Sequence, residues 1–251
     1  MKSIESMKYW QDTQVPWDCY RSGNLIYFRH FKCATSTYLG LFDDKLQWEH
    51  TNTQQIDWEK DKVFSYIRNP LQKHYKGIIE GLILFPELFD FFCRTTNANN
   101  LEFLAQLTSI EPHSYTIYRF FGENALKIHW IPIDTELDHK QATYDFLKQN
   151  GYEISEQIQD WFNNQPQKNE STDKEKHIYS KLMATPVTSD VQRYIDFDVC
   201  LYDSITKKQN FEPRNYQKRI LELMSNGKSQ TEAESTADLE VSSGQYLLWS
   251  Y

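Results

Sequence analysis

The chain has 251 residues, a formal net charge of −8 and 15% aromatic residues. This length suffices for one α/β domain with a full core, or for one domain with a small appendage. The negative charge argues against a general nucleic-acid-binding protein, because such proteins need basic surfaces to hold phosphates. The segment 1–14 is polar, and no apolar run approaches the roughly 20 residues of a membrane span. We therefore expect a cytoplasmic protein whose partners include neither nucleic acid nor membrane.

The cysteines support the same compartment. Cys19, Cys33, Cys93 and Cys200 are scattered and form no C-x-x-C pair. Such spacing is typical of a reducing environment, and it does not predict a structural zinc site. The oligomeric state is not indicated by the sequence.

The first predicted strand is the apolar run at 25–28, which has the composition of a strand buried on both faces. It breaks into a loop at 32–37, Lys-Cys-Ala-Thr-Ser-Thr, and the apolar residues at 38–42 then open a helix. A helix N-terminus attracts anions, because unpaired N–H groups and the positive end of the helix dipole lie there. The side chains that would complete an anion cradle are those of Lys32, Thr35, Ser36 and Thr37. An ordinary N-capped helix is the alternative interpretation.

A second segment repeats this pattern. The run at 62–67 predicts another strand, which ends in Arg68-Asn69-Pro70. Proline is favoured at the first position of a helix, so a helix is predicted over 70–84. Arg68 on its own would suit a surface ion pair, but two anion-type loops in succession favour a shared ligand.

The two segments together resemble the nucleotide-binding loops of sulfotransferases that use 3′-phosphoadenosine 5′-phosphosulfate (PAPS). In that family a strand, a Lys-Thr-Ala/Gly-Ser/Gly-Thr-Ser loop and a helix follow one another, and a later strand ends in Arg-Asp/Asn-Pro. The glycines of a Walker A loop are absent. The resemblance implies that 32–37 holds the 5′-phosphosulfate, and that Arg68 with the helix after it holds the 3′-phosphate. The cofactor-binding residues implied are Lys32, Cys33, Ala34, Thr35, Ser36, Thr37, Arg68 and Lys76.

Two positions depart from the family pattern. Cys33 replaces the usual threonine of the first loop, and Lys76 falls where the family has a serine. A lysine can still hold a phosphate as a point charge. Lys73 matches the basic position of the family helix.

The segment 43–61 is polar and is interpreted as a loop near the mouth of the site, with helices expected at 85–94 and 100–110. Transfer to an alcohol requires a general base, and a histidine titrating near neutrality suits that task. His113 is the preferred candidate, because a similar Asp/Glu-x-His stretch precedes an aromatic segment in several carbohydrate-type members. A structural histidine is the alternative. The rivals for the base are His50, Glu49 and Glu80.

The remaining elements complete the expected fold. A third strand is predicted within 125–133, and a helix over 138–150 ends before Gly151, as glycine after a last turn indicates. The charged segment 165–176 suggests a mobile loop or lid, and 191–202 resembles the closing helix of the family. Three strand–loop–helix units predict a three-layer, P-loop-like α/β fold with a central parallel sheet flanked by helices.

The chain is expected to divide into a sulfotransferase-like domain at 1–211 and a helical appendage or tail at 212–251. The tail has a faint helix-turn-helix pattern, but it lacks the basic residues of a DNA reader. The resemblance implies sulfuryl transfer from PAPS to a hydroxyl or amine of a small-molecule or carbohydrate acceptor, with no metal. Two alternatives stay open: a nucleotide or small-molecule kinase with a divergent phosphate loop, and a non-catalytic nucleotide-binding protein of the same fold.

Overall fold

A five-stranded sheet lies at the centre of the protein, with strand order β3-β1-β2-β4-β5. The computed structural model describes residues 17–33, 38, 40–107, 115–136, 138–164, 171–207 and 215–242. The strands are β1 (Asp18–Ser22), β2 (Leu25–Phe28), β3 (Glu49–Asn52), β4 (Lys62–Ile67) and β5 (His129–Pro132).

The predicted parallel strands account for three of the five strands of this sheet. Strands β2, β4 and β5 run parallel to one another, at the three places where the sequence predicted strands. The expectation of a wholly parallel sheet is wrong, because β1 pairs antiparallel with both β2 and β3. The hairpin between β1 and β2 turns at Gly23, whose φ of 59° suits the tight turns that join antiparallel strands. The segment 43–61 is likewise no simple loop, since it contains β3 and the single turn η2 (Thr53–Gln55).

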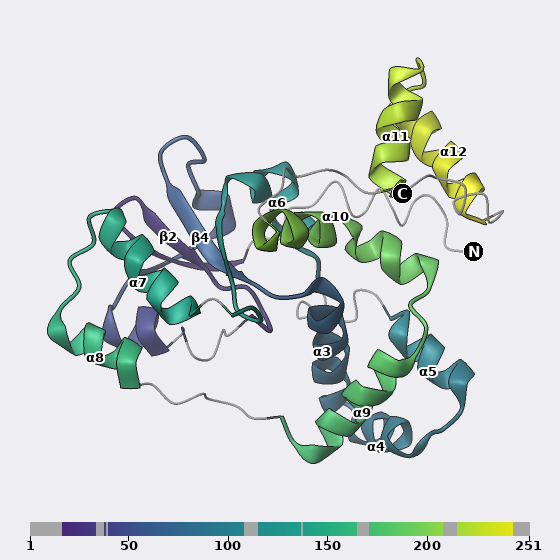
Figure 1. The fold of residues 1–251 in the computed structure, drawn as a ribbon, viewed down its shortest axis with the longest axis horizontal. Helices are drawn as coiled ribbons and strands as arrows, with labels where there is room; N and C mark the ends of the chain where they lie inside the picture. The colour runs from purple at the N-terminus through teal and green to yellow at the C-terminus, as the bar shows by residue number, and fades with distance from the viewer. Residues whose placement is uncertain are drawn as a thin grey trace.

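Helices lie on both sides of the sheet (Figure 1), and alternating side chains of its strands pack into two cores. Tyr27 and Phe64 face a core closed by the π-helical turn η1 (Gly40–Lys45) and by two helices, α7 (His139–Gln149) and α8 (Glu156–Asn164). Ile26 and Phe28 face the opposite core. That core is closed by α6 (Ile117–Phe121), the 3₁₀ turn η4 (Gly122–Lys127) and α10 (Ser189–Thr206). The layered α/β arrangement is thus confirmed.

A group of four helices packs beside the sheet and has a core of its own, which includes Tyr75, Leu82 and Ile178. Its members are α3 (Pro70–Ile83), α4 (Pro86–Arg94), α5 (Ala98–Ala105) and α9 (Asp173–Ala184). Their positions confirm the helices predicted from 70, 85 and 100 onward, and helix α9 begins within the segment that was expected to be a loop.

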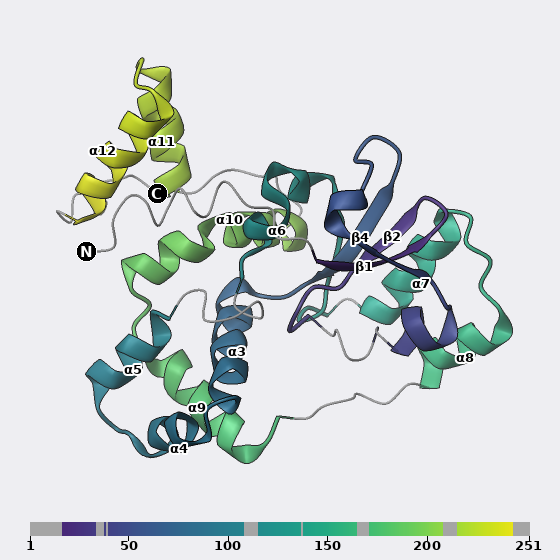
Figure 2. The ribbon, with the colours of Figure 1, turned by 180° about the vertical axis from the view of Figure 1, so that it is seen from behind.

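The last described helices, α11 (Asn215–Ser225) and α12 (Gln230–Ser242), form a hairpin (Figures 1 and 2). Arg219 of α11 binds both carboxylate oxygens of Glu240 of α12, at 2.8 and 2.9 Å. The division of the chain at residue 211 stays a prediction. No helix in the described part of the chain is long and apolar enough to span a membrane.

Candidate functional site

The carboxyl ends of the three parallel strands bring together residues that are far apart in the sequence. Lys32 lies in the turn that follows β2, Arg68 directly follows β4, and Asp134 follows β5. Ligands of open α/β sheets bind beyond the carboxyl ends of the strands. A ligand site is therefore expected at this edge of the sheet.

Lys32 has an unusual backbone conformation. Its φ is 57°, a left-handed value that costs a non-glycine residue about 1–2 kcal/mol. Such strain often accompanies functional positions. The Nζ atom of Lys32 lies 2.5 Å from a carboxylate oxygen of Glu80 on α3, and both side chains are partly exposed. A lysine and a carboxylate therefore stand side by side in reach of solvent.

The loop that follows Lys32 is held at both ends. Cys33 and Tyr38 are fully buried. The Tyr38 ring stacks on Tyr66 with centroids 3.9 Å apart, and its hydroxyl lies 2.7 Å from Nδ1 of His139. Burial raises the pKa of the Cys33 thiol to about 11, so this cysteine is a core residue and no nucleophile. Ala34, Thr35, Ser36 and Thr37 lie outside the described residues.

Lys76 on α3 stands close to two other cations. Burial lowers the pKa of Lys76, and the positive charges of Arg68 and Lys32 lower it further. Its Nζ lies 5.7 Å from the centroid of the Tyr179 ring on α9. Within the described ranges, neither Arg68 nor Lys76 has a hydrogen-bond or ion-pair partner. An anion bound here would relieve the mutual repulsion of the three cations.

Lys73, which the family resemblance assigned to the same ligand, has a different position. Its side chain is only 3% exposed, and its Nζ donates a hydrogen bond to the carbonyl oxygen of Tyr115. Burial lowers the pKa of Lys73, and the nearby carboxylate of Asp198 opposes that effect. Lys73 thus joins α3 to the segment before α6 and to α10, and it does not reach the surface of the site.

Asp134 ties three elements together at the same edge. One of its oxygens accepts a hydrogen bond of 2.6 Å from the backbone N–H of Asn69, and the other accepts one of 2.9 Å from the Tyr202 hydroxyl on α10. Burial, followed by the hydrogen bond to Asp134, raises the pKa of Tyr202 to about 12. Asn69 in turn caps α3 through the N–H groups of Leu71 and Gln72. The backbone directly after Arg68 is therefore fixed by Asp134 and by the start of α3.

Sequence reasoning missed the roles of Asp134, Tyr179 and Tyr202, and it did not pair Lys32 with Glu80. Only Asp134 had a usable signal, because it directly follows the third predicted strand. The others come from helices that are remote in sequence, and their approach depends on the packing of α3 against α9 and α10.

Two of the proposed bases do not join this site. His50 and Glu49 lie on β3, the edge strand that β1 separates from β2. His113 lies outside the described residues. Among the candidate bases that the structure describes, Glu80 is the one next to Lys32.

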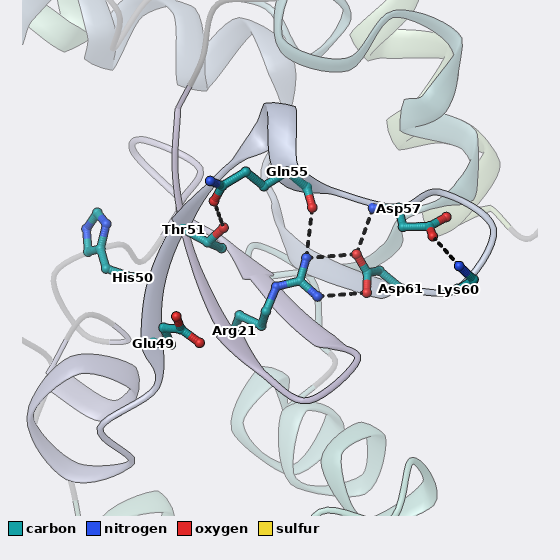
Figure 3. Close-up of a pocket in the computed structure, with 8 residues that line it drawn as sticks. All are labelled: Arg21, Glu49, His50, Thr51, Gln55, Asp57, Lys60 and Asp61. Carbon is teal, nitrogen blue, oxygen red and sulfur yellow. Dashed lines mark hydrogen bonds and ion pairs between the residues drawn. The ribbon is translucent and has the colours of Figure 1, made fainter.

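His50 instead lines a hollow of about 440 Å³ at the β3 edge of the sheet, shown in Figure 3. Arg21 binds both carboxylate oxygens of Asp61 at 2.9 Å and the carbonyl oxygen of Gln55 at 3.0 Å. Lys60 pairs with Asp57 at 3.1 Å. The cations of the hollow are therefore already paired within the protein. The residues that line it are Arg21, Glu49, His50, Thr51, Gln55, Asp57, Lys60 and Asp61.

In the described part of the chain, no group of three or more histidine, cysteine, aspartate or glutamate side chains is arranged to hold a metal ion. Comparison with models of known protein families, with curated proteins and with solved structures gives no match.

Proposed function

We propose that the protein is a PAPS-dependent sulfotransferase whose site lies at the carboxyl ends of β2 and β4. The observation that carries the proposal is the convergence of Lys32, Arg68 and Lys76, of which Arg68 and Lys76 lack an anionic partner among the described residues. Three cations in one place fit a ligand with several anionic groups. Because the whole chain carries a net charge of −8, such a ligand requires a local basic site.

The two anionic ends of the nucleotide have separate partners in this proposal. Lys32 and the loop at 34–37 bind the 5′-phosphosulfate, as the resemblance to the first nucleotide-binding loop of the sulfotransferases implies. Arg68 and Lys76 bind the 3′-phosphate, because they lie on the next strand end and on the helix that follows it. Tyr179, which stands over Lys76, limits the positions that the lysine can adopt.

PAPS would supply the sulfuryl group. Glu80 would accept the proton of the acceptor hydroxyl as its oxygen attacks the sulfur atom, and the bond from sulfur to the leaving 5′-phosphate oxygen would break. Lys32 would stabilise the negative charge that grows on that oxygen, by positioning and electrostatics. The spacing of 2.5 Å between Lys32 and Glu80 lets one acceptor oxygen stand near both groups. His113 stays an alternative base.

Thermal unfolding with nucleotides tests this proposal. Adenosine 3′,5′-bisphosphate, the product left after transfer, should stabilise the protein by roughly 2.7 kcal/mol at about 100 times its dissociation constant. ATP with Mg²⁺ should stabilise it much less, whereas a larger effect of ATP would favour the kinase alternative. No shift with the bisphosphate would contradict the proposal. Bisphosphate binding without turnover over a panel of acceptors would favour the non-catalytic alternative.

A further inference from the structure

Helix α3 carries both the proposed reactive pair and a group of exposed apolar side chains on one face. Residues three and four apart lie on the same face of a helix. Lys76 and Glu80 are therefore followed on that face by Ile83 and Leu84, at the end of α3. Leu84 retains helical backbone angles, so the helical spacing extends to it.

The apolar side chains continue into α4. Ile83, Leu84 and Phe85 are 43, 66 and 53% exposed, and Leu88 and Phe91 are 49 and 46% exposed. We call these five side chains the apolar ridge. They make up half of the large hydrophobic residues that are exposed in the described part of the chain. Exposed apolar residues that gather in this way mark binding surfaces more often than single ones do.

From this continuity we infer that the acceptor is an alcohol with an apolar body, such as a long-chain or aromatic alcohol, and not a free sugar. The inference rests on the proposed function, because it takes Glu80 as the group next to the acceptor hydroxyl. The helix rises about 1.5 Å per residue, which places Leu84 about 6 Å beyond Glu80. If the hydroxyl of the acceptor lies at Glu80, the carbon atoms next to that hydroxyl can therefore contact the apolar ridge.

The charges beside the ridge support a neutral ligand. Glu87 lies in the first turn of α4, and Asp90 of the same helix pairs with Lys174 at 2.8 Å. Arg94 lies in the last turn of α4. Acidic groups among the apolar residues disfavour binding to an anionic lipid surface, which requires clustered lysine or arginine. A neutral alcohol is not repelled by these acidic groups.

Calorimetric titration with 1-butanol, 1-hexanol and 1-octanol tests the inference. Each buried methylene contributes about fourfold in affinity, so 1-octanol should bind far more tightly than 1-butanol, and glucose should not bind. Leu84→Ser should weaken 1-octanol at least about tenfold, by removing apolar contact area. Leu239→Ser is the matched control, because Leu239 is 67% exposed on the remote helix α12.

The same variants are titrated with adenosine 3′,5′-bisphosphate, which should bind both as it binds the unmodified chain. Two results would overturn the inferred acceptor class and leave the proposed function standing. One is binding of the bisphosphate without binding of 1-octanol, and the other is an equal loss of 1-octanol affinity in Leu84→Ser and Leu239→Ser. No bisphosphate binding by the unmodified chain would overturn the proposed function. Sedimentation adds a further outcome: a dimer that Leu84→Ser converts to monomer, with no 1-octanol binding, would show that the ridge is covered by a second copy of the chain.

Discussion

The carboxyl edge of the parallel strands and the hollow at the β3 edge both contain basic and acidic side chains. Among the described residues, Arg68 and Lys76 at the carboxyl edge lack the anionic partners that Arg21 and Lys60 have in the hollow. Arg21 in the hollow has its pKa raised, first by the hydrogen bonds to Asp61. Lys76 at the carboxyl edge has its pKa lowered by burial and by neighbouring cations. The hollow has a volume of about 440 Å³, yet the charges of Arg21 and Lys60 are paired within the protein. Cations that lack an anionic partner therefore identify the candidate site better than the presence of a hollow does.

The comparison is tested most strongly by exchanging one glutamate in each region. Glu80→Gln should lower turnover by roughly 10²–10⁴-fold, the usual contribution of a general base. Glu49→Gln, the same change in the hollow, should leave turnover close to that of the unmodified chain. The assay measures sulfuryl transfer from PAPS to 1-octanol or to another acceptor from the panel. Turnover that survives Glu80→Gln but is lost in His113→Ala would assign the base to His113.

A second comparison concerns Lys73 and Lys76 of α3, of which Lys73 is the buried one. Lys73→Ala removes the buried hydrogen bond to the carbonyl oxygen of Tyr115 and the positive charge near Asp198, and it should destabilise the protein by about 1–3 kcal/mol. Lys73→Met, which keeps the apolar length of the side chain, controls for the lost volume. Urea unfolding measures both variants. A change below about 1 kcal/mol in each would show that the buried lysine does not hold α3 to α10.

Arg68→Ala should weaken adenosine 3′,5′-bisphosphate by about 1.5–3 kcal/mol, because a charge-assisted contact is lost. Adenosine 5′-phosphosulfate, which lacks the 3′-phosphate, should be affected much less. Arg21→Ala is the matched control from the hollow, and it should change neither affinity. Equal losses of both ligands in calorimetry would mean that Arg68 supports the fold instead of the 3′-phosphate.

The smallest effect is expected for Lys76→Met. The folded-state pKa of Lys76 lies below its ordinary value, so the unfolded chain binds more protons between the two pKa values. The contribution of Lys76 to stability therefore rises with pH across that window and is unfavourable below it. At neutral pH the substitution should raise the free energy of unfolding by up to about 1 kcal/mol, or about 2–4 °C in Tm. A lower Tm would show that Lys76 is stabilised by a partner.

The sequence predicted the elements whose signals are local. Strands β2 and β4 and helices α3 and α7 were found from their apolar runs and from Pro70 and Gly151. Strand β1 was missed because it has no apolar run, since Asp18, Arg21 and Ser22 are polar, although Gly23-Asn24 is a turn signal. The different surroundings of Lys73 and Lys76 were not predictable, because the carboxylate near Lys73 belongs to Asp198, which lies more than a hundred residues away. The ion pair between Lys32 and Glu80 was likewise not predictable, because it forms only when α3 packs beside the end of β2.

Hydrogen–deuterium exchange with and without adenosine 3′,5′-bisphosphate tests the location of the site most directly. It reports on the backbone of the whole chain, including the loop at 34–37. The account predicts protection in peptides that cover 31–40 and 66–80, with no change in peptides that cover 49–61. Protection at 49–61 alone, or none anywhere at saturating ligand, would contradict it.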